Sequence, residues 1–288
     1  MQDQVAAVVA DLGLATLGLP IPGVLYHSTS VPDALIVSPR QEIRQSANIS
    51  IRAGLPIEQQ AGLEQRVEEG LDVSALVVPI GGVGVYPTMI MRTTDRAWLI
   101  STIAHEWTHN YLQLRPLGLL YDHTPELRTM NETTADIVGA EVGDEVMRRF
   151  YPDAGAAGLP ESLVQMLPGD NSVPARADPP PFDFRAEMHT TRVRVDDLLA
   201  SGKIVEAESY MELRRRLFVE NGYFIRRLNQ AYFAFYGAYA DTPGGAAGED
   251  PVGPAVRALR AHSRSLSAFV NRIAWMTSFV QLQNAVGP

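Results

Sequence analysis

Hydrophobic and polar positions alternate in short runs over the first third of the chain, a pattern typical of half-buried strands. Strands are expected at Val24–Ser30, Ala34–Ser38, Ala47–Arg52, Val73–Pro79 and Gly84–Thr93. The last run contains Pro87, which has no N–H to give to a strand ladder, so we expect this strand at a sheet edge. Helical spacing over Val5–Leu14 and from Pro56 to about Gly70 adds two helices. The first third is therefore predicted to be α+β.

Two helices with clear start signals follow this region. The first is predicted over residues 95–114, with Thr94 or Asp95 as its amino-terminal cap. The second begins at Thr124-Pro125-Glu126, where a capping residue precedes a proline at the first helical position, and it ends near Phe150.

The remaining sequence is predicted to be helical apart from two connections. Tyr151–Asp183 contains seven prolines and little charge, which indicates an extended connection or a surface loop. Helices are expected at Phe184–Ala200, Val205–Glu220, Tyr223–Ala240 and Pro254–Ala285, with Asp241–Gly253 as a glycine-rich loop before the last. The basic runs Arg214-Arg215-Arg216 and Arg226-Arg227 are interpreted as solvated helix faces.

Charge and composition exclude several functions. The chain has 33 acidic against 24 basic side chains and a formal charge of −9, which argues against a nucleic acid partner. It contains no cysteine, so any metal must be held by His, Asp or Glu. The uncharged stretches Leu12–Pro32 and Val73–Met91 contain prolines and glycines, so no membrane-spanning segment and a soluble chain are expected. Residues 1–14 lack the pattern of a signal peptide, and the compartment stays open.

The strongest chemical signal is the segment His105-Glu106-Trp107-Thr108-His109. Two histidines four residues apart lie on one face of a helix, and their imidazoles converge on a common point, which is the spacing that a zinc ion needs. Glu106 follows the first histidine, so its carboxylate can reach a water on the metal without binding the metal itself. A catalytic zinc also needs a third protein ligand and an open position.

Several residues compete for the place of the third ligand. The metzincin pattern is excluded because Arg115 and Leu112 occupy the positions of its histidine and glycine. The best candidate is Glu132, on the second predicted helix and 23 residues after the second histidine. Glu126 and Glu141 lie on the same helix, but Glu126 is in its first turn, where interaction with the helix dipole is explanation enough.

The segment His105–His109, called the pentad below, and the downstream Asn131-Glu132-Thr133-Thr134-Ala135-Asp136 resemble the gluzincin metallopeptidases. The motif of that clan pairs HExxH with an NExx(A/S)D helix. The resemblance covers roughly residues 84–150. It implies one zinc ion per chain, Glu132 as the third zinc ligand and Asp136 as the partner of a zinc histidine. A carboxylate in that place fixes the tautomer of the imidazole and raises its basicity. Asp122 would suit an HExxH branch with an aspartate ligand, but the Gly-Thr-x-x-Asp motif of that branch is missing.

Two departures set this sequence apart within the clan. The aminopeptidase branch carries Gly-x-Met-Glu-Asn before its HExxH helix, whereas this chain has Gly82-Val83-Gly84-Val85-Tyr86-Pro87-Thr88. The Asn-Ala-aromatic strand of the thermolysin-like branch is missing as well. We therefore expect an outlying member whose specificity is open.

The resemblance also implies a mechanism in which Glu106 acts as general base. It further implies an oxyanion donor, a Tyr or His from the carboxy-terminal lobe. The candidates are Asn229, Tyr232, Tyr236, Tyr239 and His189. We favour Tyr232 or Tyr236, although aromatic side chains at helical spacing are more often core residues.

These inferences combine into one expected architecture and function. We expect an α+β, zincin-like, two-lobed fold, with an amino-terminal lobe over residues 1–118 and a mainly helical lobe over residues 119–288. The expected function is a zinc metallopeptidase acting on peptides or proteins. The alternative is a noncatalytic protein that uses the same scaffold and zinc for structure or partner recognition. Glu106 favours the enzyme, because metal binding alone does not need it. Substrate preference and oligomeric state are left open.

Overall fold

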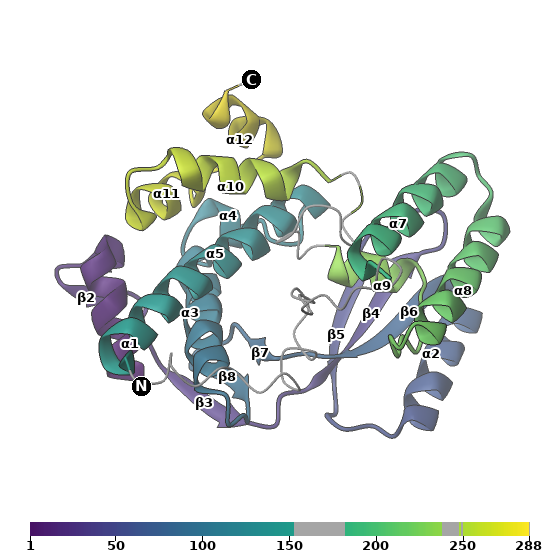
Figure 1. Cartoon of the computed structure of the whole chain (residues 1–288), viewed down its shortest axis with the longest axis horizontal. Helices are drawn as coiled ribbons and strands as arrows, with labels where there is room; N and C mark the ends of the chain where they lie inside the picture. The colour runs from purple at the N-terminus through teal and green to yellow at the C-terminus, as the bar shows by residue number, and fades with distance from the viewer. Residues whose placement is uncertain (153–181, 238–247, 249, 288) are drawn as a thin grey trace, which may run out of the picture. The chain divides into compact units, whose positions relative to one another are not determined.

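A computed structural model describes residues 1–152, 182–237, 248 and 250–287. It belongs to the predicted α+β class and combines many helices with small sheets (Figure 1). The chain forms two compact units. Unit 1 comprises the described parts of Met1–Val31, Ile80–Leu159 and Pro251–Pro288, and unit 2 those of Pro32–Pro79 and Pro160–Asp250. Most of the two connections predicted at residues 151–183 and 241–253 lies outside the described residues.

Unit 1 is built around two neighbouring helices, α3 (Arg96–Leu112) and α5 (Pro125–Phe150) (Figure 1). Both begin where the sequence predicted. The Asp95 side chain accepts a hydrogen bond from the Trp98 N–H at 3.0 Å, and Thr124 accepts one from the Leu127 N–H at 3.3 Å. Each cap satisfies a backbone donor that would otherwise lack a partner in the first helical turn. The boundary expected between residues 118 and 119 falls inside this unit.

Glycines on α5 allow it to approach α3 closely. A Cβ atom added at Gly139 would lie 2.9 Å from the Ser101 carbonyl oxygen and 3.1 Å from the Cβ of His105. A Cβ at Gly143 would collide with the side chain of Ser101. Because these two glycines carry no side chain, α5 can lie close to α3 beside His105, the first histidine of the pentad.

The larger of the two sheets in unit 1 has three strands, β3 (Tyr26–Thr29), β7 (Gly82–Val83) and β8 (Thr88–Met91). β8 lies between β3, with which it is parallel, and β7, with which it is antiparallel. The prediction of an edge strand over residues 84–93 is therefore wrong. The strand begins after Pro87, so the proline removes no donor from the ladder.

The rest of unit 1 surrounds these elements and the apolar core between them. The further elements are α1 (Gln2–Val9), the π-helical η1 (Ala10–Leu14), β1 (Ala15–Thr16), β2 (Leu19–Pro20), α4 (Pro116–Leu119), α10 (Val252–His262), α11 (Leu266–Ile273) and α12 (Phe279–Val286). The single helix predicted over Pro254–Ala285 is wrong. Ser265 and Ser278 cap new helices by accepting hydrogen bonds from the N–H groups of Ala268 and Gln281.

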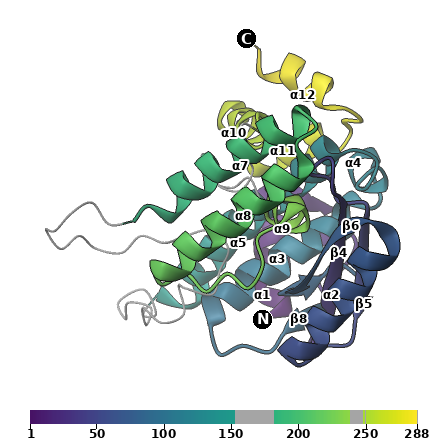
Figure 2. The same cartoon turned by 90° about the vertical axis from the view of Figure 1, so that its right-hand side faces the viewer.

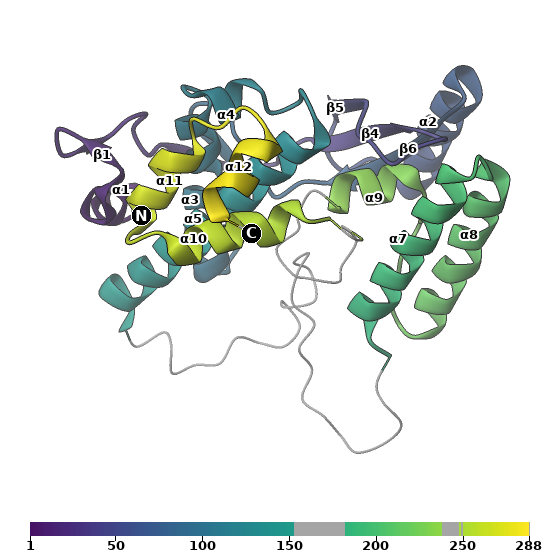
Figure 3. The ribbon, with the colours of Figure 1, turned by 90° about the horizontal axis from the view of Figure 1, so that it is seen from above.

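Unit 2 contains an antiparallel sheet of order β5-β4-β6. Its elements are β4 (Asp33–Pro39), β5 (Ala47–Ile51), α2 (Ile57–Leu71), β6 (Val73–Pro79), α7 (Phe184–Ala200), α8 (Ile204–Glu220) and α9 (Gln230–Tyr236). The sheet packs with α2 and with α9. Both β4 and β6 have five successive buried residues, as expected for strands covered on both faces. Helices α7 and α8 run side by side, as Figure 2 and Figure 3 show.

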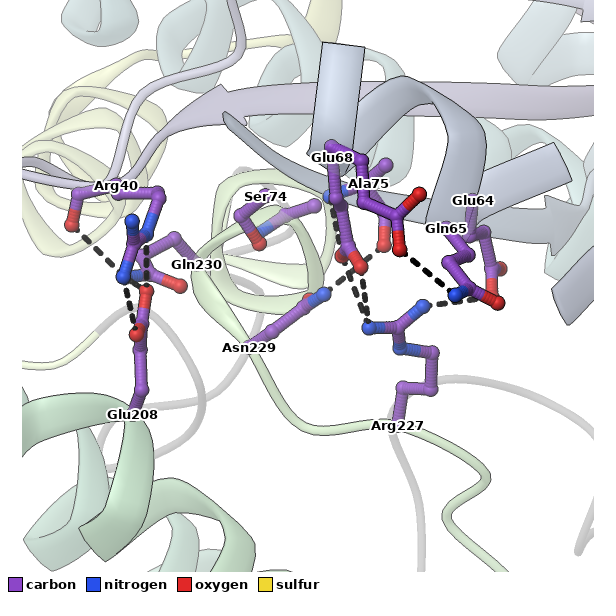
Figure 4. Close-up of polar contacts among 12 residues, drawn as sticks. Arg40, Glu64, Gln65, Glu68, Ser74, Ala75, Glu208, Arg227, Asn229 and Gln230 are labelled. Atoms are coloured by element: carbon purple, nitrogen blue, oxygen red, sulfur yellow. Dashed lines mark hydrogen bonds and ion pairs between the residues drawn. The ribbon is translucent and has the colours of Figure 1, made fainter. Parts of the chain in front are cut away.

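Only part of the helix predicted over Tyr223–Ala240 forms. Helix α9 begins at Gln230, because Asn229 caps it by accepting a hydrogen bond from the Tyr232 N–H at 3.0 Å. The amide nitrogen of Asn229 also donates to the Ala75 carbonyl at 2.9 Å (Figure 4). The preceding residues 223–229 are not helical. Tertiary contacts with β6 and α2 thus decide the conformation of this segment, and they override its helical periodicity.

Arg226 and Arg227 do not form a solvated helix face, and that prediction is wrong. Glu64 on α2 is fully buried and accepts hydrogen bonds from the Val77 N–H at 2.6 Å and from Arg226 Nη1 at 2.7 Å. Arg227 Nη2 donates to Glu68 at 2.8 Å (Figure 4). The two arginines therefore fasten an irregular segment to α2 through a partly buried ion-pair network.

The other basic run is solvated only in part. Arg214 is largely buried, pairs with Glu187 and donates from Nε to the Thr191 hydroxyl at 2.8 Å. Arg215 is about one quarter exposed and Arg216 about two thirds, with Nε of each paired to Glu212. The interpretation as a solvated face therefore holds for Arg216 and is wrong for Arg214.

None of the helices in the described ranges is both long enough and apolar enough to span a membrane.

Candidate metal centre

Helices α3 and α5 bring three predicted ligands together. His105 and His109 lie one turn apart on α3, and Glu132 lies on the neighbouring α5. Their ligand atoms are all within 4.8 Å of one another, and within the described ranges they form the only cluster of three or more acidic or histidine residues able to hold a metal ion. The grouping that the sequence motifs predicted is therefore present in the fold of unit 1.

The distances between the three atoms suit a tetrahedral ion. Nε2 of His105 lies 3.0 Å from Nε2 of His109, and each of these nitrogens lies 3.6 Å from Oε2 of Glu132. Tetrahedral zinc with bonds of about 2.0–2.2 Å places neighbouring ligand atoms about 3.3–3.6 Å apart. The triangle thus has the size of one face of a zinc coordination shell.

Hydrogen bonds orient both imidazoles. Nδ1 of His105 lies 2.9 Å from Oδ1 of Asp136, the contact that the motif implied. Nδ1 of His109 lies 2.8 Å from Oδ1 of Asn131, whose amide nitrogen donates to the Leu117 carbonyl at 3.3 Å. With both oxygens acting as acceptors, each Nδ1 carries a proton, so the Nε2 lone pairs face the centre of the group.

The third atom of the triangle is an acceptor with no donor. Oε2 of Glu132 is buried and has no hydrogen-bond partner among the described residues. Burial raises the pKa of the Glu132 carboxyl, but His109 and His105 lower it further, so the net pKa lies well below its usual value. A buried carboxylate oxygen without a donor is costly unless a cation compensates it.

The surroundings of His105 also favour positive charge at the centre. Burial lowers the pKa of this imidazole, yet the hydrogen bond with Asp136 and the nearby carboxylate of Glu132 raise it well above its usual value overall. Two nitrogens and one carboxylate oxygen form a donor set that zinc commonly accepts. The residues present therefore fit a zinc ion in both geometry and charge.

Tyr121 and Arg128 hold the other oxygen of Glu132, a feature that the sequence did not predict. The Tyr121 hydroxyl donates to Oε1 of Glu132, and Nε of Arg128 donates to the Tyr121 oxygen at 3.3 Å. Arg128 precedes Glu132 by four residues on α5, so helical spacing alone could have placed it on the same face. Tyr121 comes from the turn between α4 and α5, and no motif or spacing in the sequence pointed to it.

Glu106 lies on α3 beside strand β7. A Cβ added at Gly82 would lie 2.8 Å from Cδ of Glu106, and a Cβ at Gly84 would lie 2.9 Å from Cβ of His109. Residues without a side chain thus let β7 pass close to the pentad. Burial raises the pKa of the Glu106 carboxyl above its usual value. Glu106 is adjacent to the ligand triangle without being part of it.

The competing carboxylates lie outside the metal cluster. Asp122 and Glu126 are exposed and belong to no group of three possible ligands. Glu141 pairs with Arg260, whose Nε lies 2.7 Å from the carboxylate. Of the carboxylates considered as third metal ligand, Glu132 is therefore the one that the geometry supports.

The favoured oxyanion donors, Tyr232 and Tyr236, lie on α9 in unit 2. Their ring centroids are 4.5 Å apart, and Tyr232 packs against the apolar cluster of α7, α8 and α9. Burial raises the pKa of the Tyr232 phenol. Of the remaining candidates, His189 is on α7, and Tyr239 lies outside the described residues. A catalytic part for Tyr232 or Tyr236 stays a prediction.

Comparison with known proteins supplies no family. No protein-family model matches the chain, and searches of curated proteins and of solved structures found no significant match either. The geometry and chemistry of the site are therefore the only basis for assigning a function.

Proposed function

We propose that this protein is a zinc-dependent metallopeptidase with a gluzincin-like, zincin-type fold. In this proposal His105, His109 and Glu132 bind one Zn²⁺ per chain, and Glu106 serves as general base. The observation that carries the proposal is the convergence of two imidazole nitrogens and one partnerless carboxylate oxygen at zinc-like spacing, beside a second glutamate, Glu106, that metal binding does not require.

The chemistry divides between the ion and the chain. A zinc ion bound by these ligands would lower the pKa of a coordinated water toward about 7 and polarise a substrate carbonyl. Glu106 accepts the proton of the attacking water and returns it to the amine that leaves. Asp136 and Asn131 keep the two imidazoles in the tautomer that presents Nε2.

A peptide substrate is supported by the position of β7. This strand pairs with β8 on one side, and no other strand of the described chain pairs with it, so it forms an edge of its sheet. An extended peptide can add to such an edge through backbone hydrogen bonds. Gly82 on β7 lies close to Glu106, and Gly84, directly after the strand, lies close to His109, so the edge passes where a scissile bond would have to lie.

The direct test replaces the proposed base without removing a ligand. Glu106→Gln keeps the size of the side chain but cannot accept a proton, so it should retain zinc and lose about 10²- to 10⁴-fold in turnover of a mixed library of internally quenched peptides. Glu126→Gln, an exposed glutamate in the first turn of α5, is the matched control and should retain full activity.

Two results would contradict this proposal, the first its mechanism and the second the activity itself. Equal cleavage by the wild type and Glu106→Gln would exclude Glu106 as the base. Stoichiometric zinc without cleavage of any peptide would favour the alternative, a noncatalytic zinc-binding protein.

A further inference from the structure

The two carboxylate oxygens of Glu132 have different surroundings. Oε2 faces the Nε2 atoms of His105 and His109 at 3.6 Å each and has no hydrogen-bond partner among the described residues. Oε1 accepts the hydrogen bond of the Tyr121 hydroxyl. One oxygen is therefore satisfied by the protein, and the other is left for the ion.

The Tyr121 hydroxyl is itself fixed in direction. Nε of Arg128 donates to the phenolic oxygen at 3.3 Å, and Arg128 is only 5% exposed. An oxygen that already accepts from a guanidinium has its own O–H free to donate, and the carboxylate of Glu132 is the acceptor it reaches. The three groups form a chain in which a cation polarises a hydroxyl that holds an anion.

The backbone and ring of Tyr121 are also held in place. Its N–H donates to the Gly118 carbonyl at 3.2 Å, and its ring packs edge-on against His109 with centroids 6.1 Å apart. The phenol thus touches one ligand residue through its ring and another through its hydroxyl. Removal of the hydroxyl alone would leave the packing with His109 intact.

We propose that Tyr121, oriented by Arg128, is a positioning residue that holds Glu132 with Oε2 toward the metal and Oε1 away from it. The inference rests on the proposed metal centre and deepens it. A free carboxylate can rotate and offer either oxygen, so an ion must restrict this rotation when it binds. A carboxylate held beforehand has already lost this freedom, and the metal affinity is correspondingly higher.

The test is the zinc affinity of Tyr121→Phe, measured by competition with a chromophoric chelator. The loss of an orienting partner typically weakens metal binding about 10- to 100-fold, and we expect a loss of this size. Tyr151→Phe is the matched control, because it removes a hydroxyl that donates to Gln4 at 2.8 Å within the same unit and away from the metal ligands. It should leave the zinc affinity unchanged.

Additional measurements separate positioning from other roles. Thermal unfolding of the metal-free variants reports whether each is folded, so the affinity is compared between folded proteins. With Co²⁺ in place of zinc, the visible bands should change in Tyr121→Phe and stay the same in Tyr151→Phe, because they respond to the arrangement of the ligands.

The outcomes separate this inference from the proposed function. Wild-type zinc affinity in folded Tyr121→Phe would overturn the positioning role, and a loss of turnover at full zinc occupancy would then assign the hydroxyl to the reaction. A wild type that binds no zinc would overturn both proposals. A wild type that binds zinc tightly but cleaves no peptide would overturn the peptidase alone, and the affinity of Tyr121→Phe would still decide the positioning role.

Discussion

Replacing Gly139 by alanine tests whether the close approach of α5 to α3 builds the metal centre. The added Cβ would lie 2.9 Å from the Ser101 carbonyl oxygen, inside the 3.0 Å below which such contacts essentially do not occur, and 3.1 Å from Cβ of His105. Overpacking of this kind costs about 1–3 kcal/mol. The better helix propensity of alanine returns about 0.5–1 kcal/mol. The net expectation is a destabilisation of about 1 kcal/mol, within a range of about 0–2.5 kcal/mol.

The control for this variant is a second helical glycine in open surroundings. A Cβ at Gly62 on α2 would meet only Nη1 of Arg66, at an ordinary 3.6 Å, so Gly62→Ala should raise the free energy of unfolding. Urea unfolding of the metal-free proteins measures both changes. Gly139→Ala should also bind zinc more weakly, since it displaces the helix of Glu132 from that of His105. A Gly139→Ala protein as stable as the wild type, with equal zinc affinity, would show that this glycine does not set the spacing of α3 and α5.

Two further predictions concern the buried charges. Burial raises the pKa of Glu64, but hydrogen bonds from Arg226 and the Val77 N–H outweigh it, so the pKa is lower in the folded than in the unfolded protein. The ionised Glu64 therefore stabilises the fold above its unfolded pKa of about 4.5, and this stabilisation is lost as the pH falls further. Glu64→Gln should therefore lower the free energy of unfolding by about 1.5–3 kcal/mol at pH 7, with a difference that shrinks toward pH 3; a constant difference in urea titrations across this range would contradict the linkage. Asp136→Asn should weaken zinc binding about 10- to 100-fold because it removes the charge that holds His105, and unchanged affinity by chelator competition would show that this contact is dispensable.

Local signals were sufficient to predict the helices that carry the site. Asp95 and Thr124 cap α3 and α5 through their own side chains, and such contacts depend only on residues a few positions away. The spacing within His105–His109 likewise fixes which side chains share a helical face. These features follow from the sequence because they need no knowledge of distant segments.

The errors have two sources. At Ser265 and Ser278 a local signal was overlooked, because the helical periodicity of residues 254–285 continues across both serines although each caps a new helix. The other error arose where distant segments decide the structure. Residues 223–229 have helical spacing but are held in an irregular path, with Arg226 and Arg227 bound to Glu64 and Glu68. Burial and ion pairing with α2 outweighed the local preference in this segment.

In the candidate site, too, the features decided by nearby residues were predicted and those decided by distant segments were not. The pentad and the Glu132 helix were predicted because each motif lies within one element. Tyr121 was missed because it reaches Glu132 from a turn, and the path of that turn depends on tertiary packing. Gly82 and Gly84 were noted only as a departure from related motifs, and their crowding against the pentad needed the fold.

The metal content of the purified protein decides whether His105, His109 and Glu132 hold a zinc ion. Elemental analysis of the wild type, His109→Ala, Glu132→Ala and the control Glu126→Gln, each prepared in the same way, compares loss of a ligand with loss of an exposed carboxylate. The account predicts near-stoichiometric zinc in the wild type and in Glu126→Gln, and little or none in the two ligand variants. A folded wild type that holds no zinc even after reconstitution, or ligand variants that retain it in full, would contradict the account.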